Sequence, residues 1–205
     1  MERPPRPNWL ELGLLLGLGA GNVAVELTGL PKTPLVVGGA GLWAIYLAAR
    51  LRRDRGTLRR WGLRVDTLRP AARDAASVTL PLAAAMAAYG FARGHLPPPP
   101  GFWWILVLYP VWGLAQNFLL NAMLARNLRT VLPERLVVVV ATLLFSLSHA
   151  PDLEIMALTL LVAPIWLVLY RRNPNLWVLG LAHGLLGTLA FFAVLGRNVL
   201  QTLLG

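Results

Sequence analysis

The stretch LEIMALTLLVAPIWLVLY, residues 153–170, carries a single charged side chain, Glu154. Because about 20 apolar residues in a helix cross the hydrocarbon core of a bilayer, this stretch predicts a transmembrane helix. Comparable apolar stretches recur along almost the whole 205-residue chain, which is 57% hydrophobic and only 14% charged. That composition excludes an ordinary soluble domain and predicts an integral membrane protein.

Seven such segments are separated by short polar or proline-rich connections. In chain order they cover about residues 9–30, 34–49, 75–92, 102–126, 133–149, 153–170 and 175–196. The continuous apolar run Leu136–Val140 favours helices and lacks the alternation that marks the strands of a membrane barrel. We therefore predict an all-α fold, a polytopic bundle of about seven transmembrane helices in one membrane-embedded domain over residues 1–205.

The first apolar segment differs from a cleaved secretion signal. Glu11 interrupts its apolar region, no convincing small-residue cleavage site follows, and six more segments come after it. We predict that this segment is retained as a transmembrane helix. We also expect Glu11, Glu26 and Glu154 to pair with cytoplasmic or interfacial groups and to take no part in catalysis.

Basic residues are unevenly distributed along the chain, which has a net charge of +10. Eleven of the nineteen lie in the stretch 50–73 or at Arg3 and Arg6. If the N-terminus is cytoplasmic and the chain crosses the membrane seven times, these residues face the cytoplasm. The same holds for Arg126, Arg129, Arg135, Arg171 and Arg172. Only Lys32, Arg93 and Arg197 remain outside. This asymmetry follows the positive-inside rule and predicts a multi-pass protein with a cytoplasmic N-terminus.

The basic stretch 50–73 predicts a cytoplasmic loop or interfacial helix that contacts anionic lipid head groups. An acidic partner protein is the alternative, whereas the distribution of charge argues against a nucleic-acid partner. The near-exclusive use of arginine over lysine, together with many Ala, Leu and Gly residues, favours a GC-rich bacterial source. We therefore expect the protein in the bacterial inner membrane, surrounded by membrane lipids.

Uncharged polar residues stand inside the fourth segment, at Gln116, Asn117 and Asn121. Asn117 and Asn121 are four residues apart and share one face of a helix, whereas Gln116 points about 100° away from Asn117. Each amide on its own is more typical of a hydrogen bond between helices than of a site. Together they place polar groups where burial is costly.

Two histidines add to this pattern. His149 ends the fifth segment just before Asp152, whose carboxylate can accept a proton from the histidine ring. His183 lies in the middle of the seventh segment, between apolar neighbours. Because two imidazoles and several amides are costly to bury in a membrane, their presence indicates a functional site.

Several other classes of site lack their usual residues. The chain has no cysteine, so it contains neither a disulfide nor a thiolate ligand or nucleophile. It has no glycine-rich phosphate loop and no Gly-x-Ser-x-Gly turn, and we expect no cofactor. Ser146 and Ser148 lie near His149 and raise a serine protease of the membrane interior as an alternative, but its usual buried serine motif is missing.

The order of these groups resembles the CAAX prenyl protease and bacteriocin-processing family of intramembrane endopeptidases. Members of that family carry Glu-Glu-x3-Arg, then Phe-x3-His, then a further His-x3-Asn on successive helices. The corresponding residues are Gln116-Asn117-x3-Asn121, Phe145-x3-His149 and His183-x3-Gly187. The flanking stretches 61–64 and 170–177 are also similar, so the likeness covers about residues 50–192, with a protease-like core at about 75–196.

In that family a glutamate and a histidine are thought to activate a water that attacks a peptide carbonyl, while asparagine and histidine steady the oxyanion. The resemblance implies a membrane-associated protein or peptide substrate. It also implies five candidate catalytic residues, Gln116, Asn117, Asn121, His149 and His183. Only the two histidines are retained, because amides replace the glutamate pair and the arginine, and Gly187 replaces the final asparagine.

An amide cannot act as a general base near neutral pH, so the family mechanism cannot run unchanged. Either His149 is the sole base, or the fold serves as a scaffold or as a binding protein for a membrane peptide or lipid. Gln116 or Asn117 can still donate a hydrogen bond to an oxyanion or a bound peptide.

A metal ion held by His149 and His183, with Asp152 or Glu154 as a third ligand, is a further alternative. We expect no metal, because two scattered histidines without a His-Glu-x2-His pair are a weak signal.

Overall fold

The computed structural model describes residues 7–198 and contains helices and connecting turns, with no strand in that range. This confirms the predicted all-α fold. The chain divides into two compact units, each built from two separate stretches of sequence. Within the described residues, the first unit contains residues 7–62 and 119–168, and the second unit contains residues 63–118 and 169–198. Arg3 and Arg6 of the predicted basic side lie outside the described residues.

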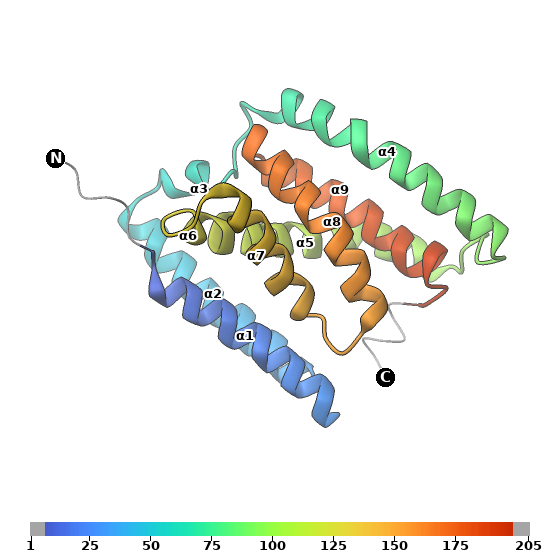
Figure 1. The fold of residues 1–205 in the computed structure, drawn as a ribbon, viewed down its shortest axis with the longest axis horizontal. Helices are drawn as coiled ribbons and strands as arrows, with labels where there is room; N and C mark the ends of the chain where they lie inside the picture. Colours follow the sequence, from blue (N-terminus) through green and yellow to red (C-terminus); the bar gives the residue numbers. More distant parts are fainter. Residues whose placement is uncertain (1–6, 199–205) are drawn as a thin grey trace. The chain divides into compact units, whose positions relative to one another are not determined.

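The first unit is formed by helices from the beginning and the middle of the chain (Figure 1). They are α1 (Trp9–Thr28), α2 (Thr33–Arg53), α3 (Thr57–Arg60), most of η1 (Phe118–Ala125), α6 (Arg126–Leu128), α7 (Glu134–Leu147) and most of α8 (Leu153–Arg172). η1 is a π-helix, a form that is rare and frequent at functional sites. Nothing in the residue pattern of the fourth apolar segment had indicated it.

Local signals explain how α1 begins and ends. The side chain of Asn8 accepts hydrogen bonds from the backbone N–H groups of Leu10 and Glu11, as an N-cap does. Gly29 ends the helix with a φ of 68°, a left-handed conformation that glycine adopts without strain. The helix then packs closely on α2, where a Cβ atom added to Gly39 would lie 2.9 Å from the Leu18 side chain.

The second unit is formed by α4 (Leu68–Ala92), α5 (Gly101–Asn117), α9 (Leu176–Leu189) and η2 (Ala190–Val194) (Figure 1). The main packing is between α5 and α9. At one end of this pair, Phe102 and Ile105 form an apolar core with Leu189, Phe192 and Ala193.

Within residues 7–198, six helices are long and apolar enough to cross a membrane. They cover residues 9–28, 33–53, 68–92, 101–128, 153–172 and 176–194. The predicted segment 133–149 instead contains the 14-residue helix α7, whose length of about 21 Å is less than the thickness of the hydrocarbon core. Pro133 precedes this helix and a turn at residues 148–151 ends it. A polytopic helical membrane bundle is confirmed.

The basic stretch 50–73 is not one loop. It contains the last turn of α2, the short helix α3 and the first turns of α4, which begins at Leu68 and not near residue 75 as predicted. Asp54 ends α2, accepts a hydrogen bond from the Gly56 N–H and pairs with Arg60. Arg60 and the Gly56 N–H together hold the pKa of the Asp54 carboxyl below its usual value.

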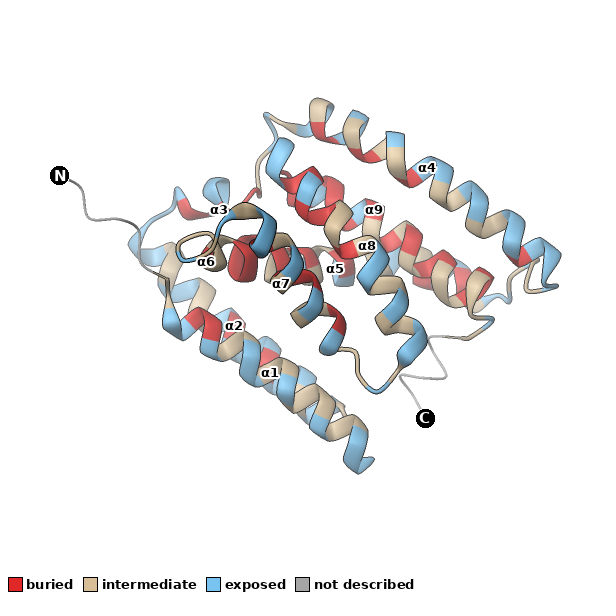
Figure 2. Ribbon diagram, viewed as in Figure 1, coloured by how far each residue is buried: buried red, intermediate tan, exposed pale blue. Residues whose placement is uncertain are grey.

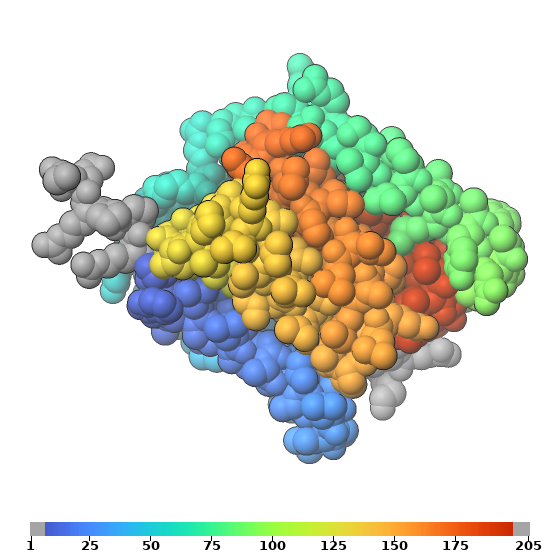
Figure 3. Space-filling model, in the orientation of Figure 1, coloured from blue at the N-terminus to red at the C-terminus, as the bar shows by residue number. Residues whose placement is uncertain are grey.

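Burial differs strongly among the spans. α9 is the most buried of them, whereas α1 and α2 expose most of their surface (Figure 2). In the space-filling view α1 lies at the surface along its length (Figure 3). Its exposed side chains include Trp9, Leu10, Leu16 and Leu27, which suits a helix that faces lipid.

Candidate functional site

Asn117 and His183 are brought together in the second unit. Asn117 lies on α5 and is fully buried, and its Nδ2 lies 3.0 Å from Nδ1 of His183 on α9. The same nitrogen lies 3.0 Å from the Gly113 carbonyl oxygen. A carbonyl can only accept, so the hydrogen bond to Gly113 assigns the donating NH₂ group of Asn117 to this side.

This contact determines which ring nitrogen of His183 carries the proton. Because the Asn117 NH₂ group only donates, Nδ1 of His183 must accept. A neutral imidazole that accepts at Nδ1 carries its proton on Nε2. His183 therefore presents an N–H donor on its other nitrogen.

Small residues bring the backbones of α5 and α9 close enough for this contact. A Cβ atom added to Gly113 would lie 2.8 Å from the Gly180 carbonyl oxygen, and one added to Gly180 would lie 2.9 Å from Leu114. A Cβ atom on Gly184, the residue after His183, would lie 2.6 Å from Pro110. Glycine at these positions allows the two helices to approach closely, as in many membrane bundles.

The start of α9 is held by Asn175, which is fully buried. Its side-chain oxygen accepts from the Val178 N–H as an N-cap, and its Nδ2 donates to the Arg64 carbonyl at 2.8 Å. Thr67 donates to the neighbouring Pro174 carbonyl. These bonds fix where α9 begins, and thereby the rotation at which His183 appears two turns later.

Gly187 occupies the position of the final asparagine of the family motif. A side chain at this position would overlap the ring of Tyr109 on α5. The space that an asparagine would need is therefore filled by an aromatic ring in this chain.

His149 lies in the first unit, in the turn after α7. Its Nδ1 lies 2.8 Å from the Phe145 carbonyl oxygen, and its ring meets the Phe145 ring edge to face at 5.0 Å. A carbonyl accepts only, so Nδ1 carries the proton and Nε2 presents a lone pair. The Phe-x3-His spacing thus has a direct structural role, because the residue four positions earlier supplies the acceptor.

The two histidines consequently have opposite hydrogen-bonding directions. His149 offers an acceptor at Nε2, and His183 offers a donor at Nε2. Asp152, expected to orient the His149 ring, caps α8 by accepting from the Ile155 N–H, while its own N–H donates to the His149 carbonyl. The Phe145 carbonyl is the group that accepts the hydrogen bond from Nδ1 of His149.

The remaining predicted residues lie on one continuous helix. Gln116 is half-buried in the last turn of α5, next to Asn117. Asn121 lies in η1 and is fully buried. η1 is a π-helix, and residues four positions apart, such as Asn117 just before it and Asn121 within it, still lie close to one face although the rotation per residue is smaller than in an α-helix.

The serine alternative finds no support in the hydrogen bonds of these residues. Ser146 Oγ donates to the Met156 carbonyl at 2.9 Å, and Ser148 Oγ donates to the Phe145 carbonyl at 2.7 Å. The 3.5 Å separation of Ser148 Oγ from His149 Nδ1 is too long for an activating hydrogen bond. Among residues 7–198, no group of three or more His, Asp or Glu side chains could hold a metal ion.

A further polar cluster was only partly anticipated. Glu11 is fully buried and pairs with Arg126, and Glu26 pairs with Lys32 near the end of the same helix. The expectation that these glutamates are partnered is confirmed. The partners themselves could not be predicted, because Glu11 and Arg126 are far apart in sequence; a lone glutamate in an apolar run was the available signal.

The helices and polar intramembrane residues define a class, that of multi-pass membrane proteins with candidate catalytic groups inside the bilayer. Residues 97–189 match a family model described as Rce1-like, type II CAAX prenyl endopeptidase. The match covers just under half of the chain and includes the positions of all five candidate residues. It confirms the resemblance to the CAAX protease family. No curated protein and no solved structure matches the chain.

Proposed function

We propose that the protein is an intramembrane endopeptidase that hydrolyses peptide bonds of membrane-associated proteins, with His149 as general base. The observation that carries this proposal is the match of residues 97–189 to the type II CAAX prenyl endopeptidase model, together with the proton on Nδ1 of His149 that the Phe145 carbonyl accepts. A lone pair on Nε2 of His149 suits proton abstraction, and an N–H on Nε2 of His183 suits stabilisation of negative charge.

In the proposed reaction, Nε2 of His149 takes a proton from water while the water oxygen bonds to the peptide carbonyl carbon. The carbonyl oxygen becomes an oxyanion, which hydrogen-bond donors stabilise. The C–N bond then breaks, and the proton on His149 passes to the leaving nitrogen. The products are a carboxylic acid and an amine, and no other reactant is consumed.

The amides have supporting roles in this proposal. Asn117 holds the His183 tautomer that donates, through the 3.0 Å contact to Nδ1. Gln116 and Asn121 provide hydrogen bonds to the oxyanion or to the substrate backbone, because an amide can donate and accept but cannot serve as a base. The base assigned to glutamate in the family is assigned here to His149.

The test uses membranes in which the chain is co-expressed with single-pass membrane proteins tagged at both ends. Wild type and His95→Ala, a change to the one histidine outside the motifs, are expected to give the same shortened fragment. His149→Ala should lower the cleavage rate by about 10²–10⁴, as loss of a general base does. Equal cleavage by wild type and His149→Ala would exclude the proposed base.

A noncatalytic binding protein is the second candidate function. It is favoured by the absence of the glutamate pair and by the Tyr109 ring that fills the space beside Gly187. If wild type is inert and Gln116→Glu gains cleavage, the chain is a protease fold that has lost its base. If wild type, His149→Ala and Gln116→Glu all leave the tagged proteins intact, the binding function replaces the proposed one.

A further inference from the structure

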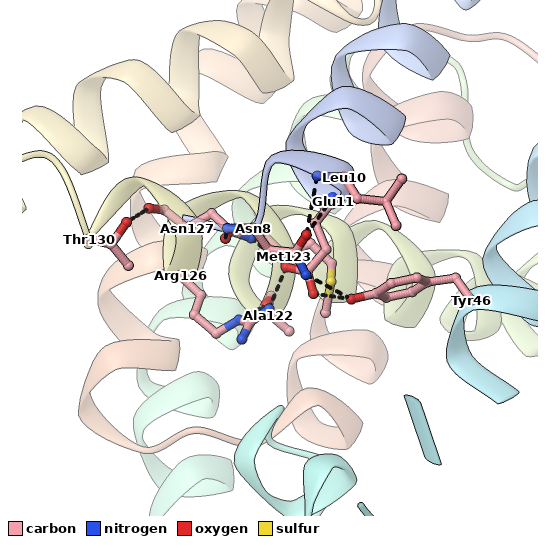
Figure 4. A network of polar contacts seen from close by, with 9 residues as sticks. All are labelled: Asn8, Leu10, Glu11, Tyr46, Ala122, Met123, Arg126, Asn127 and Thr130. Carbon is pink, nitrogen blue, oxygen red and sulfur yellow. Dashed lines mark hydrogen bonds and ion pairs between the residues drawn. The ribbon is translucent and has the colours of Figure 1, made fainter. Parts of the chain in front are cut away.

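Glu11 lies within the apolar helix α1, yet its side chain has no exposure and both carboxylate oxygens are bound. Tyr46 of α2 donates its hydroxyl hydrogen to one oxygen, and the Arg126 guanidinium and the Asn127 amide donate to the other. Figure 4 shows these groups converging from three parts of the first unit. A buried carboxylate with a cationic partner and two neutral donors is well compensated for the loss of water.

Arg126 and Asn127, the two donors on α6, each make a second hydrogen bond. Arg126 Nε also donates to the Ala122 carbonyl at 2.7 Å, and Asn127 Nδ2 also donates to the Met123 carbonyl at 2.8 Å (Figure 4). These carbonyls lie at the end of η1, where the π-helix returns to α-helical geometry in α6. Side-chain donors there supplement the backbone hydrogen bonds of an uncommon helical form.

The same cluster is tied to the beginning of α1. The backbone N–H of Asn8 donates to Oδ1 of Asn127 at 2.6 Å, and Asn8 Nδ2 lies 3.3 Å from the Tyr46 hydroxyl. The Asn127 amide is thus used on both its oxygen and its nitrogen. The bonds together fix the rotamers of Arg126 and Asn127, and Glu11 is the acceptor that these two side chains share.

We propose that Glu11 is a positioning residue that holds the π-helix η1, and with it Asn121, in place. Glu11 does not act as a base in this proposal, because hydrogen-bond donors occupy both of its oxygens. Its helix, α1, lies outside the segment 97–189 that matches the family model. The effect of Glu11 on catalysis rests on the proposed function, whereas its effect on η1 does not.

A second contact places α1 against the His149 turn. Asn22, also on α1, donates to the Ser148 carbonyl at 2.9 Å, and a Cβ atom added to Gly19 would lie in ordinary van der Waals contact, 3.6 Å from the Ser148 side chain. Glu11 and Asn22 are about 16 Å apart along the helix. α1 therefore contacts, at two separate points, the segments that carry Asn121 and His149.

The test is hydrogen–deuterium exchange of the full chain in lipid nanodiscs, measured by mass spectrometry. In Glu11→Gln the amides of residues 118–128 should exchange faster by on the order of tenfold or more, because a buried ion pair is lost. Glu26→Gln is the matched control, since it removes a glutamate of the same helix that also has a cationic partner but is 32% exposed, whereas Glu11 is fully buried. The control should leave residues 118–128 unchanged.

Faster exchange throughout the chain in Glu11→Gln, or no change at residues 118–128, would overturn the proposal. If Glu11→Gln does not accumulate, Tyr46→Phe removes one hydroxyl of the cluster and should raise exchange in the same residues by a smaller factor. Exchange does not require cleavage, so this result stands even if the chain proves inert. Where cleavage is measurable, Glu11→Gln should lower kcat with little change in KM, and Glu11→Asp should recover part of the loss.

Discussion

At the scale of single residues, the hydrogen bonds of two histidines carry the functional argument. His149 donates from Nδ1 to the Phe145 carbonyl, and His183 accepts at Nδ1 from Asn117. Each partner has only one possible role, so the two tautomers follow from the chemistry of the partners. The result is one ring with an acceptor nitrogen at Nε2 and one with an N–H donor at Nε2.

These tautomers can be measured directly. The chain contains only three histidines, so ¹⁵N-histidine labelling gives three ring systems that single-residue variants assign. At neutral pH the proton of His149 should reside on Nδ1 and that of His183 on Nε2. Asn117→Leu, which removes the donor to His183, should abolish the preference of His183 and leave the tautomer of His149 unchanged. A His183 ring protonated at Nδ1 in wild type would contradict the assignment.

The sequence identified the histidines but not their roles. His149 and His183 stood out because imidazoles are rare inside apolar segments. Their tautomers depend on the Phe145 carbonyl and on Asn117, one on the same turn and the other on a different helix. The role given to Asp152 came from its proximity in sequence and stays a prediction; in the structure its carboxylate accepts from the Ile155 N–H at the start of α8.

At the scale of helices, close packing between α5 and α9 positions Asn117 against His183. Gly113, Gly180 and Gly184 remove the side chains that would otherwise keep the two backbones apart. The sequence alone did not show that α5 packs against α9. The glycines are visible around His183, but their partners, such as Pro110 and Leu114, are known only once the two helices are paired.

Adding one methyl group at this contact should destabilise the protein. Gly184→Ala places a Cβ atom 2.6 Å from Pro110, and such overpacking typically costs about 1–3 kcal/mol. Gly13→Ala on α1, where no atom lies within 4 Å of the added Cβ, should change stability by less than about 1 kcal/mol. The two variants are compared by unfolding them in mixed micelles with an increasing fraction of denaturing detergent. Equal stability of both would show that the α5–α9 contact is looser than described.

Helix boundaries were predicted to within a few residues where the apolar run had clear ends. α4 was the main exception, because its first two turns contain Arg69, Arg73 and Asp74 and so lack an apolar signal. The π-helix η1 was missed for a different reason. Its form is stabilised by Arg126, Asn127 and Glu11, and the third of these is more than a hundred residues away in sequence.

At the scale of the whole molecule, charge predicts how the chain is oriented in the membrane. The segment from the last turn of α2 to the end of α3 carries five exposed arginines, at positions 52, 53, 55, 59 and 60. The turn between α1 and α2 carries Lys32, which is paired with Glu26. By the positive-inside rule, the arginine-rich turns face the cytoplasm and the turn at Lys32 faces the opposite side.

The chain is well suited to a test of this orientation because it has no cysteine. Single variants Arg55→Cys and Lys32→Cys are treated in intact cells with a maleimide that does not cross the inner membrane. Lys32→Cys should be labelled in intact cells, and Arg55→Cys only after the membrane is opened. The reverse pattern would place the N-terminus outside and contradict the predicted topology.

The central claim is hydrolysis of a peptide bond by water that His149 activates. Its most direct test is to run the cleavage reaction in membranes suspended in H₂¹⁸O. The mass of the peptide that ends at the newly formed C-terminus is then measured by mass spectrometry. Wild type should release a fragment whose terminal carboxylate carries one ¹⁸O atom, and His149→Ala should release almost none. A labelled fragment of equal yield from both, or no fragment from wild type with any tagged membrane protein, would contradict the account.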